Sequence, residues 1–245
     1  MQTPYSALSR IILLSLIAAV VAGCSEEARR SWHLQRAERY MKAGEVEKAK
    51  IEYLKVVQSD GQNATAFRQV GLIWLEQGAL LRAAPYLVKA RELAPNDVEN
   101  RVALTRVYLA VGRLANGTKE ASAILQQAPN NGEALLYLAK AAQTPQELEF
   151  ARQQLEKFPE RDSVWAHLAA ANFALRKQDA AAVENELRRA VASDPHSPPA
   201  HLALASYLLQ KDPAQAGAEF KAAADAAPLR SEARCGPVAG RSRSE

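Results

Sequence analysis

The segment at residues 64–97, ATAFRQVGLIWLEQGALLRAAPYLVKARELAPND, determines how this chain folds. Its first half places four residues at i, i+3, i+4 and i+7, the spacing of one helical stripe: Phe67, Val70, Gly71 and Trp74. Gly78 can end this helix, because glycine adopts positive φ without steric cost. A second stripe then precedes Pro95: Ala83, Leu87 and Ala90. The segment therefore predicts two antiparallel helices, each with one apolar face.

The pattern recurs at intervals of about 34 residues. The prolines that close each helix pair are separated by 34, 30, 36 and 33 residues: Pro95, Pro129, Pro159, Pro195 and Pro228. A helix pair of this length cannot bury its own apolar face, so neighbouring pairs must stack into a solenoid. We expect a single extended array over residues 30–230, with units at residues 30–63, 64–97, 98–131, 132–161, 162–197 and 198–230.

This pattern resembles the tetratricopeptide repeat, which has the signature W-x2-L-G-x2-Y…A-x3-F…P. Residues 64–97 match this signature in spacing and mostly in residue class. The resemblance implies an all-α solenoid of about six stacked antiparallel helix pairs. Small residues are expected where helices pack closely: Gly71, Ala83, Ala49 and Ala90. Gly71 and Ala83 are expected to face each other. In the fifth unit we align the first-helix motif on three residues: Trp165, Leu168 and Ala169.

The amino terminus carries a second signal. Arg10 precedes an apolar run at residues 11–22, which is shorter than the roughly 20 residues needed to span a bilayer. The run is typical of a secretory signal. It ends in Val21-Ala22-Gly23-Cys24, which resembles the lipobox of bacterial lipoproteins. The resemblance implies that residues 1–23 are removed and that Cys24 carries lipid. The alternative is a plain signal peptide followed by a coincidental cysteine.

An acylated Cys24 would anchor the array close to a membrane, because residues 24–29 form a tether of no more than roughly 20 Å. Ser25 follows the cysteine and resembles the sorting pattern for the outer membrane, so we expect the array to face the periplasm there. Cys235 has no second cysteine left to pair with. Residues 231–245 are expected to be an incomplete repeat or a disordered tail.

The sequence contains no recognisable catalytic motif. G-x-S-x-G, G-x-x-x-x-G-K-[ST] and C-x-x-C are all absent. The histidines are dispersed, apart from a pair separated by two prolines, which disfavours a metal site: His33, His167, His196 and His201. We therefore expect no enzyme, no cofactor and no metal, with a site built from dispersed residues as the alternative. Basic and acidic residues alternate, and the formal net charge is only +4, so no nucleic-acid partner is expected.

The surface remains as the candidate site. In tetratricopeptide repeat proteins the first helix of each unit lines a concave groove that binds extended peptides or a helix. Carried over by position, the resemblance implies these groove residues: Leu34, Glu38, Arg68, Leu72, Leu75, Val102, Arg106, Leu109, Leu136 and Lys140, continued by Phe173, Leu202 and Leu209. Three of them would form a cationic row, with ordinary solvated charge as the alternative: Arg68, Arg106 and Lys140.

These features predict a membrane-anchored protein–protein interaction scaffold of the bacterial envelope with a protein or peptide partner. The size, anchor and repeats resemble lipoproteins that help assemble the secretin rings of type IV pili. They also resemble repeat lipoproteins associated with exosortase and polysaccharide export. A regulator of a cell-wall enzyme is a further alternative.

Overall fold

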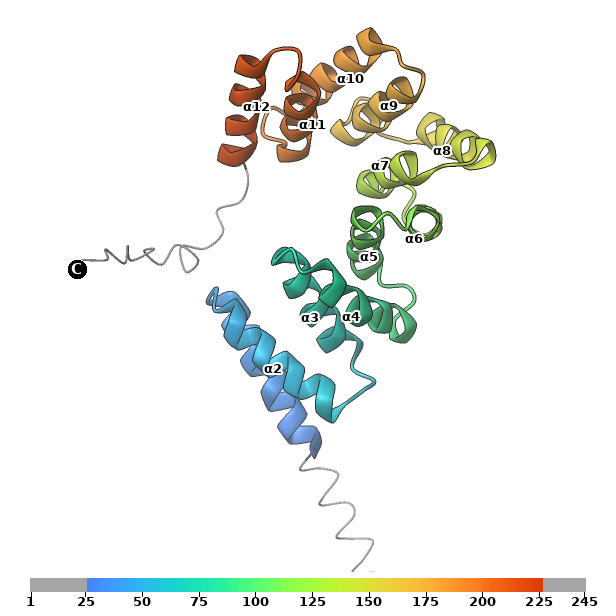
Figure 1. Cartoon of the computed structure of the whole chain (residues 1–245). Helices are drawn as coiled ribbons and strands as arrows, with labels where there is room; N and C mark the ends of the chain where they lie inside the picture. The colour runs from blue at the N-terminus through green and yellow to red at the C-terminus, as the bar shows by residue number, and fades with distance from the viewer. Residues whose placement is uncertain (1–25, 227–245) are drawn as a thin grey trace, which may run out of the picture.

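The computed structural model describes residues 26–226, and this part of the chain consists of helices and turns without a strand. The first helix covers residues 26–42. It is followed by α2 (Val46–Ser59), α3 (Ala64–Glu76), α4 (Leu80–Leu93), α5 (Val98–Ala110), α6 (Leu114–Gln127), α7 (Gly132–Ala141), α8 (Pro145–Lys157), α9 (Val164–Arg176), α10 (Ala180–Ser193), α11 (Pro198–Leu208) and α12 (Pro213–Ala226). The helix pairs stack along an arc, with α5 and α7 on its inner side and α6 and α8 outside (Figure 1). The predicted all-α solenoid is confirmed.

The first helix of most units starts at a residue whose side chain caps it. Asn63 accepts a hydrogen bond from the Ala66 N–H at 2.9 Å. The same arrangement begins α5, α7 and α9: Asp97, Asn131 and Ser163. Each cap satisfies a backbone N–H that the helix leaves unpaired. These residues therefore fix where each first helix begins.

The turn inside most units uses a left-handed residue. Gly44, Gly78 and Gly112 have φ of 73°, 73° and 75°. After α3, the Gly78 N–H donates to the Leu75 carbonyl at 3.0 Å, which is part of the Schellman pattern that ends helices. Gln178 makes the equivalent bond after α9 with φ of 58°. Gln178 thus occupies the turn-glycine position of the fifth unit.

The capping and turn residues correct the predicted register of the fifth unit. Ser163 and Gln178 place His167 where Phe67 lies in the second unit. The predicted alignment placed the first-helix motif on Trp165, Leu168 and Ala169. This alignment is wrong by two positions. The connection after α8 covers residues 158–163, whereas the connection after α4 covers only 94–97. Counting from the closing proline assigned these extra residues to the helix.

The apolar core runs from unit to unit. Leu87 of α4 is fully buried and packs in one cluster with Leu104 and Val107 of α5. Gly71 allows this side chain to approach, because a Cβ atom there would lie 2.6 Å from Leu87 Cγ. We expected Gly71 to face Ala83, but its closest neighbour is Leu87, one turn further along α4. The other small residues expected at helix contacts are buried: Ala49, Ala83 and Ala90.

Replacing Gly71 with Ala tests this contact. The new methyl would overlap a fully buried leucine side chain, and overpacking of this kind costs about 1–3 kcal/mol. Higher helix propensity returns up to about 1 kcal/mol. We expect chemical denaturation to show that the free energy of unfolding falls by up to about 2 kcal/mol.

Gly217→Ala is the matched control. Gly217 is an exposed interior residue of α12, and a Cβ atom there would meet nothing within 4 Å. This variant should therefore be more stable by up to about 1 kcal/mol. Equal stabilisation by both substitutions would contradict the close approach of Gly71 to Leu87.

Candidate functional site

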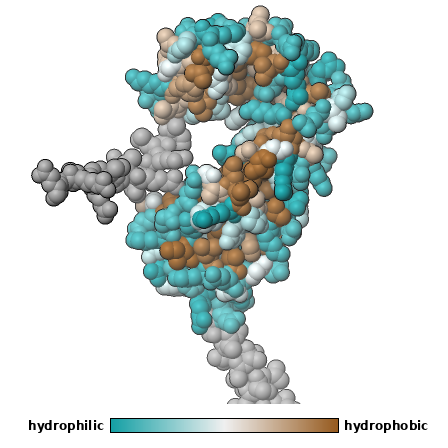
Figure 2. All heavy atoms as spheres, viewed as in Figure 1, coloured by the Kyte–Doolittle hydropathy of each residue, from teal (hydrophilic) through white to brown (hydrophobic). Residues whose placement is uncertain are grey.

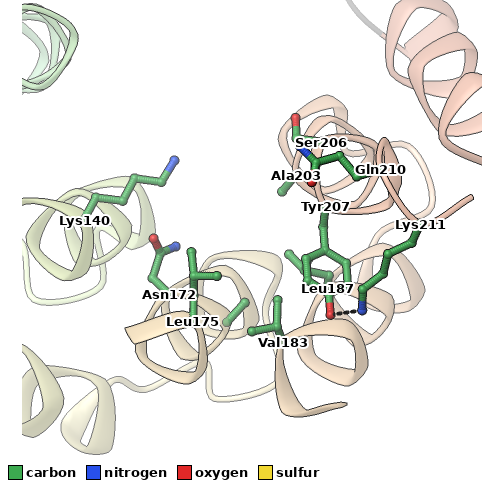
Figure 3. A pocket seen from close by; sticks show the side chains of 11 residues that line it. Lys140, Asn172, Leu175, Val183, Leu187, Ala203, Ser206, Tyr207, Gln210 and Lys211 are labelled. Atoms are coloured by element: carbon green, nitrogen blue, oxygen red, sulfur yellow. Dashed lines mark hydrogen bonds between the residues drawn. The ribbon is translucent and has the colours of Figure 1, made fainter. Parts of the chain in front are cut away.

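A hollow of about 550 Å³ lies on the chain between α7, α9 and α11. Leu175, Val183 and Leu187 form its apolar centre, while Lys140 and Lys211 reach in from opposite sides (Figure 3). The remaining lining residues come from α9, α11 and the turn after α11: Ala171, Asn172, Ala203, Ser206, Tyr207 and Gln210. The hollow therefore combines an apolar floor with polar groups and two cations at its rim.

The helix register explains why these polar groups share one hollow. Lys140, Asn172 and Ser206 are each nine residues beyond the N-cap of their helix. Equivalent positions of stacked first helices point the same way. The repeat therefore aligns an ammonium, an amide and a hydroxyl along the hollow.

The two lysines differ in their surroundings. Lys211 Nζ lies 2.5 Å from the Tyr207 hydroxyl and 3.6 Å from Glu184 Oε2. The hydrogen bond with Tyr207 raises the pKa of Lys211. Desolvation by the surrounding protein lowers the pKa of Lys140, whose ammonium makes no ion pair with any residue in 26–226. Lys140 is exposed, so its ammonium can meet an anionic group on a ligand.

The structure removes Arg68 from the predicted cationic row. Arg68 Nη1 lies 3.1 Å from Asp97 Oδ2 and 2.7 Å from Glu99 Oε2, so its charge is already paired with the next unit. Arg106 is exposed and has no ion pair within the described part of the chain. Of the row, Lys140 is the residue that lines the hollow.

The structure also corrects two apolar members of the predicted groove, Leu136 and Phe173. Leu136 is only 4% exposed and belongs to the interior. Phe173 packs against a core cluster, and Leu175 takes its place in the hollow because the register is shifted by two residues. Four others are half-buried against the core: Leu34, Leu72, Leu75 and Val102. Leu109 is half-buried, and a Cβ atom at Gly117 would lie 3.6 Å from its side chain. Three predicted residues are exposed: Glu38, Leu202 and Leu209.

Sequence reasoning missed most of the hollow. Asn172, Leu175 and Ser206 would have followed from a register that started at the cap residues Ser163 and Ser197. Val183 and Leu187 come from a second helix, α10, which the groove prediction did not include. No sequence signal shows that these side chains leave an open space between them.

A recurring histidine–glutamate pair was also missed. Nδ1 of the histidine lies 2.5, 2.7 and 2.5 Å from a glutamate oxygen of the unit's second helix in three pairs: His33–Glu52, His167–Glu186 and His201–Glu219. Arg101 and Glu120 pair at this position in the third unit. The 34-residue spacing of His167 and His201 was the available signal.

Other predicted features lie outside the described residues, namely Cys24, residues 1–23 and residues 231–245. Within residues 26–226, no group of three or more His, Cys, Asp or Glu side chains is arranged to hold a metal ion. No helix in that range has the length and apolar character needed to cross a membrane.

Comparison with known proteins supports the fold. No protein-family model matches the sequence, and no curated protein matches it. A tetratricopeptide repeat protein from Parabacteroides merdae superposes with a TM-score of 0.60 at 16% identity, covering 79% of this chain and 78% of that chain. A thermophilic tetratricopeptide repeat protein from Thermus thermophilus gives a TM-score of 0.52 at 20% identity, covering 68% of this chain and 92% of that chain. This chain has the tetratricopeptide repeat fold.

Proposed function

We propose that this chain is a binding scaffold that holds an extended segment of a protein partner in the hollow between α7, α9 and α11. The observation that carries the proposal is the open apolar floor between Lys140 and Lys211. Leu175 on this floor is 58% exposed. Burying it against a partner would release apolar surface from water, which is the main driving force of association.

The rim specifies the chemistry of the partner. Lys140 is exposed and unpaired within the described residues, so its ammonium can form a charge-assisted hydrogen bond with an acidic side chain or a backbone carbonyl of the partner. Asn172 Nδ2 donates to the Leu168 carbonyl at 2.8 Å. An extended peptide with an apolar side chain next to an acidic residue fits this arrangement.

The inner surface offers a path for such a segment beyond the hollow. Apolar side chains form separate patches along the inner side of the arc, with polar side chains around them (Figure 2). Extended segments bind repeat arrays along such surfaces. The hollow would be the deepest contact of a longer, shallower interface.

The proposed site of action is the bacterial envelope. The lipobox-like sequence ending at Cys24 supports a lipid anchor, and more than one acyl chain gives stable attachment. Ser25 supports the outer membrane, with the array facing the periplasm. A scaffold there would collect or position other envelope proteins.

Leu175→Asp tests the hollow directly. The full chain is used to capture partners from detergent-solubilised envelopes, and the proteins retained are identified by mass spectrometry. Leu175 is exposed, so the melting temperature should change little. We expect capture of the specific partner to fall at least about tenfold, because apolar contact worth about 1.5–3 kcal/mol is lost. Lys140→Ala should weaken capture in the same direction.

Leu81→Asp is the matched control. Leu81 is 82% exposed on α4 and does not line the hollow. Capture by this variant should equal that of the unchanged chain. If Leu81→Asp abolishes capture while Leu175→Asp does not, the partner binds elsewhere and the proposed site is wrong.

The lipid anchor has its own test. Mass spectrometry of the mature amino terminus should show a diacylglyceryl group on Cys24, because the residues before it resemble a lipobox. Cys24→Ala should remove both the lipid and the membrane association. An intact Met1, or cleavage at another position, would contradict the anchor without affecting the capture experiment.

A further inference from the structure

His201 in α11 has hydrogen-bond acceptors at both ring nitrogens. Nδ1 lies 2.5 Å from Glu219 Oε2 of α12, and Nε2 lies 2.9 Å from the Pro195 carbonyl before α11. A neutral imidazole carries one N–H, so only the imidazolium can donate to both acceptors. The His201 side chain is 8% exposed, which leaves water little access. The geometry therefore favours a charged histidine inside the fold.

The charged groups around the ring are all acidic. Glu219 faces it from α12, and Asp194 acts on it from the end of α10. α11 contains no charged residue, and the described residues of α9 and α10 place no cation in contact with the ring. Burial alone would lower the pKa of His201, but the bonds to Pro195 and Glu219 outweigh it, and the pKa lies above 6.5.

The apolar side chains through which α12 is buried are mostly small. Ala216 and Ala223 are the buried residues of α12, and an alanine side chain offers only one methyl group. Phe220 of the same helix remains 38% exposed. The bond between His201 and Glu219 adds a polar contact that holds α12 on α11.

The position of α12 also affects the hollow. The turn between α11 and α12 carries Gln210 and Lys211, and both side chains line the hollow. A helix that moves on α11 must move this turn, because the chain is continuous. The attachment of α12 and the shape of the rim are thus coupled.

We propose that His201 is a pH-responsive clasp, which fastens α12 to α11 when protonated and loosens α12 when its proton is lost. The clasp stands on its own geometry. Its effect on the hollow, through Lys211, rests on the proposed function. A partner would then meet a rigid rim in a mildly acidic compartment and a looser rim in an alkaline one.

The direction of the pH dependence follows from proton linkage. A histidine whose pKa is higher in the folded state stabilises that state fully below the unfolded value of about 6.5. This stabilisation is lost as the pH rises through the folded pKa. Protection of α12 should therefore decrease with rising pH, by up to about tenfold for each unit by which the pKa is raised.

The other histidine pairs provide internal comparisons. His33 and His167 each have one ring nitrogen within hydrogen-bond distance of a glutamate. The second nitrogen of His167 is 3.9 Å from Asp162, which is 88% exposed. A neutral ring can keep the single bond through Nδ1–H. The first and fifth units should consequently respond to pH less than α12 does.

Two measurements on the full chain test the clasp. NMR follows the ring signals of each histidine from pH 5 to 9, and hydrogen exchange, corrected for intrinsic rates, follows residues 213–226 at pH 6 and 8.5. We expect His201 to titrate above pH 6.5. Protection of α12 against exchange should fall over the pH range in which His201 loses its proton. Titration of His201 at or below 6.5, or protection that does not change while His201 loses its proton, would overturn the proposal.

Variants separate the clasp from general effects of pH. His201→Gln and Glu219→Gln should each reduce the pH dependence of exchange in α12. His196→Gln, at an exposed residue of the preceding turn, should leave it unchanged. If His201→Gln fails to fold, the titration of the unchanged chain still decides. If the unchanged chain captures no partner while His201 titrates above 6.5, the proposed function is wrong and the clasp still stands.

Discussion

A single helix pair within residues 26–226 cannot cover its own apolar side chains, and the rest of the structure depends on that constraint. Leu87 of α4 packs over Gly71 of its own pair and lies in one apolar cluster with Leu104 and Val107 of the next unit. Stacking therefore continues from pair to pair, and it bends into an arc (Figure 1). The arc turns the same position of successive first helices toward one surface. Lys140, Asn172 and Ser206 meet in the hollow for this reason.

The fold was predictable because its signals are local. Gly78 ends a helix by its own conformational freedom, and the apolar stripe around it needs no knowledge of distant residues. The prediction failed where a closing proline was used to place the next helix. Pro159 marks the end of α8, but the connection to α9 is longer than its counterpart after α4. The cap residue Ser163 would have given the start of α9 correctly.

The candidate site was less predictable because it depends on contacts between units. The period indicates which backbone positions are neighbours, but it does not say which charges pair. Arg68 is paired by Asp97 and Glu99 of the next unit, whereas Lys140 has no such partner among the described residues. The hollow itself arises from the curvature of three units and from small side chains at their junction. Neither property is encoded in a single segment.

The most direct test of the hollow as the partner's binding site is a methyl NMR titration of the full chain with the captured partner's segment. The methyl signals of Leu175, Val183 and Leu187, which line the hollow, should shift on binding. Those of Leu81 and Ile51, which are 82% and 52% exposed outside it, should stay in place. Shifts at Leu81 or Ile51 with unchanged signals in the hollow would contradict the proposed binding surface.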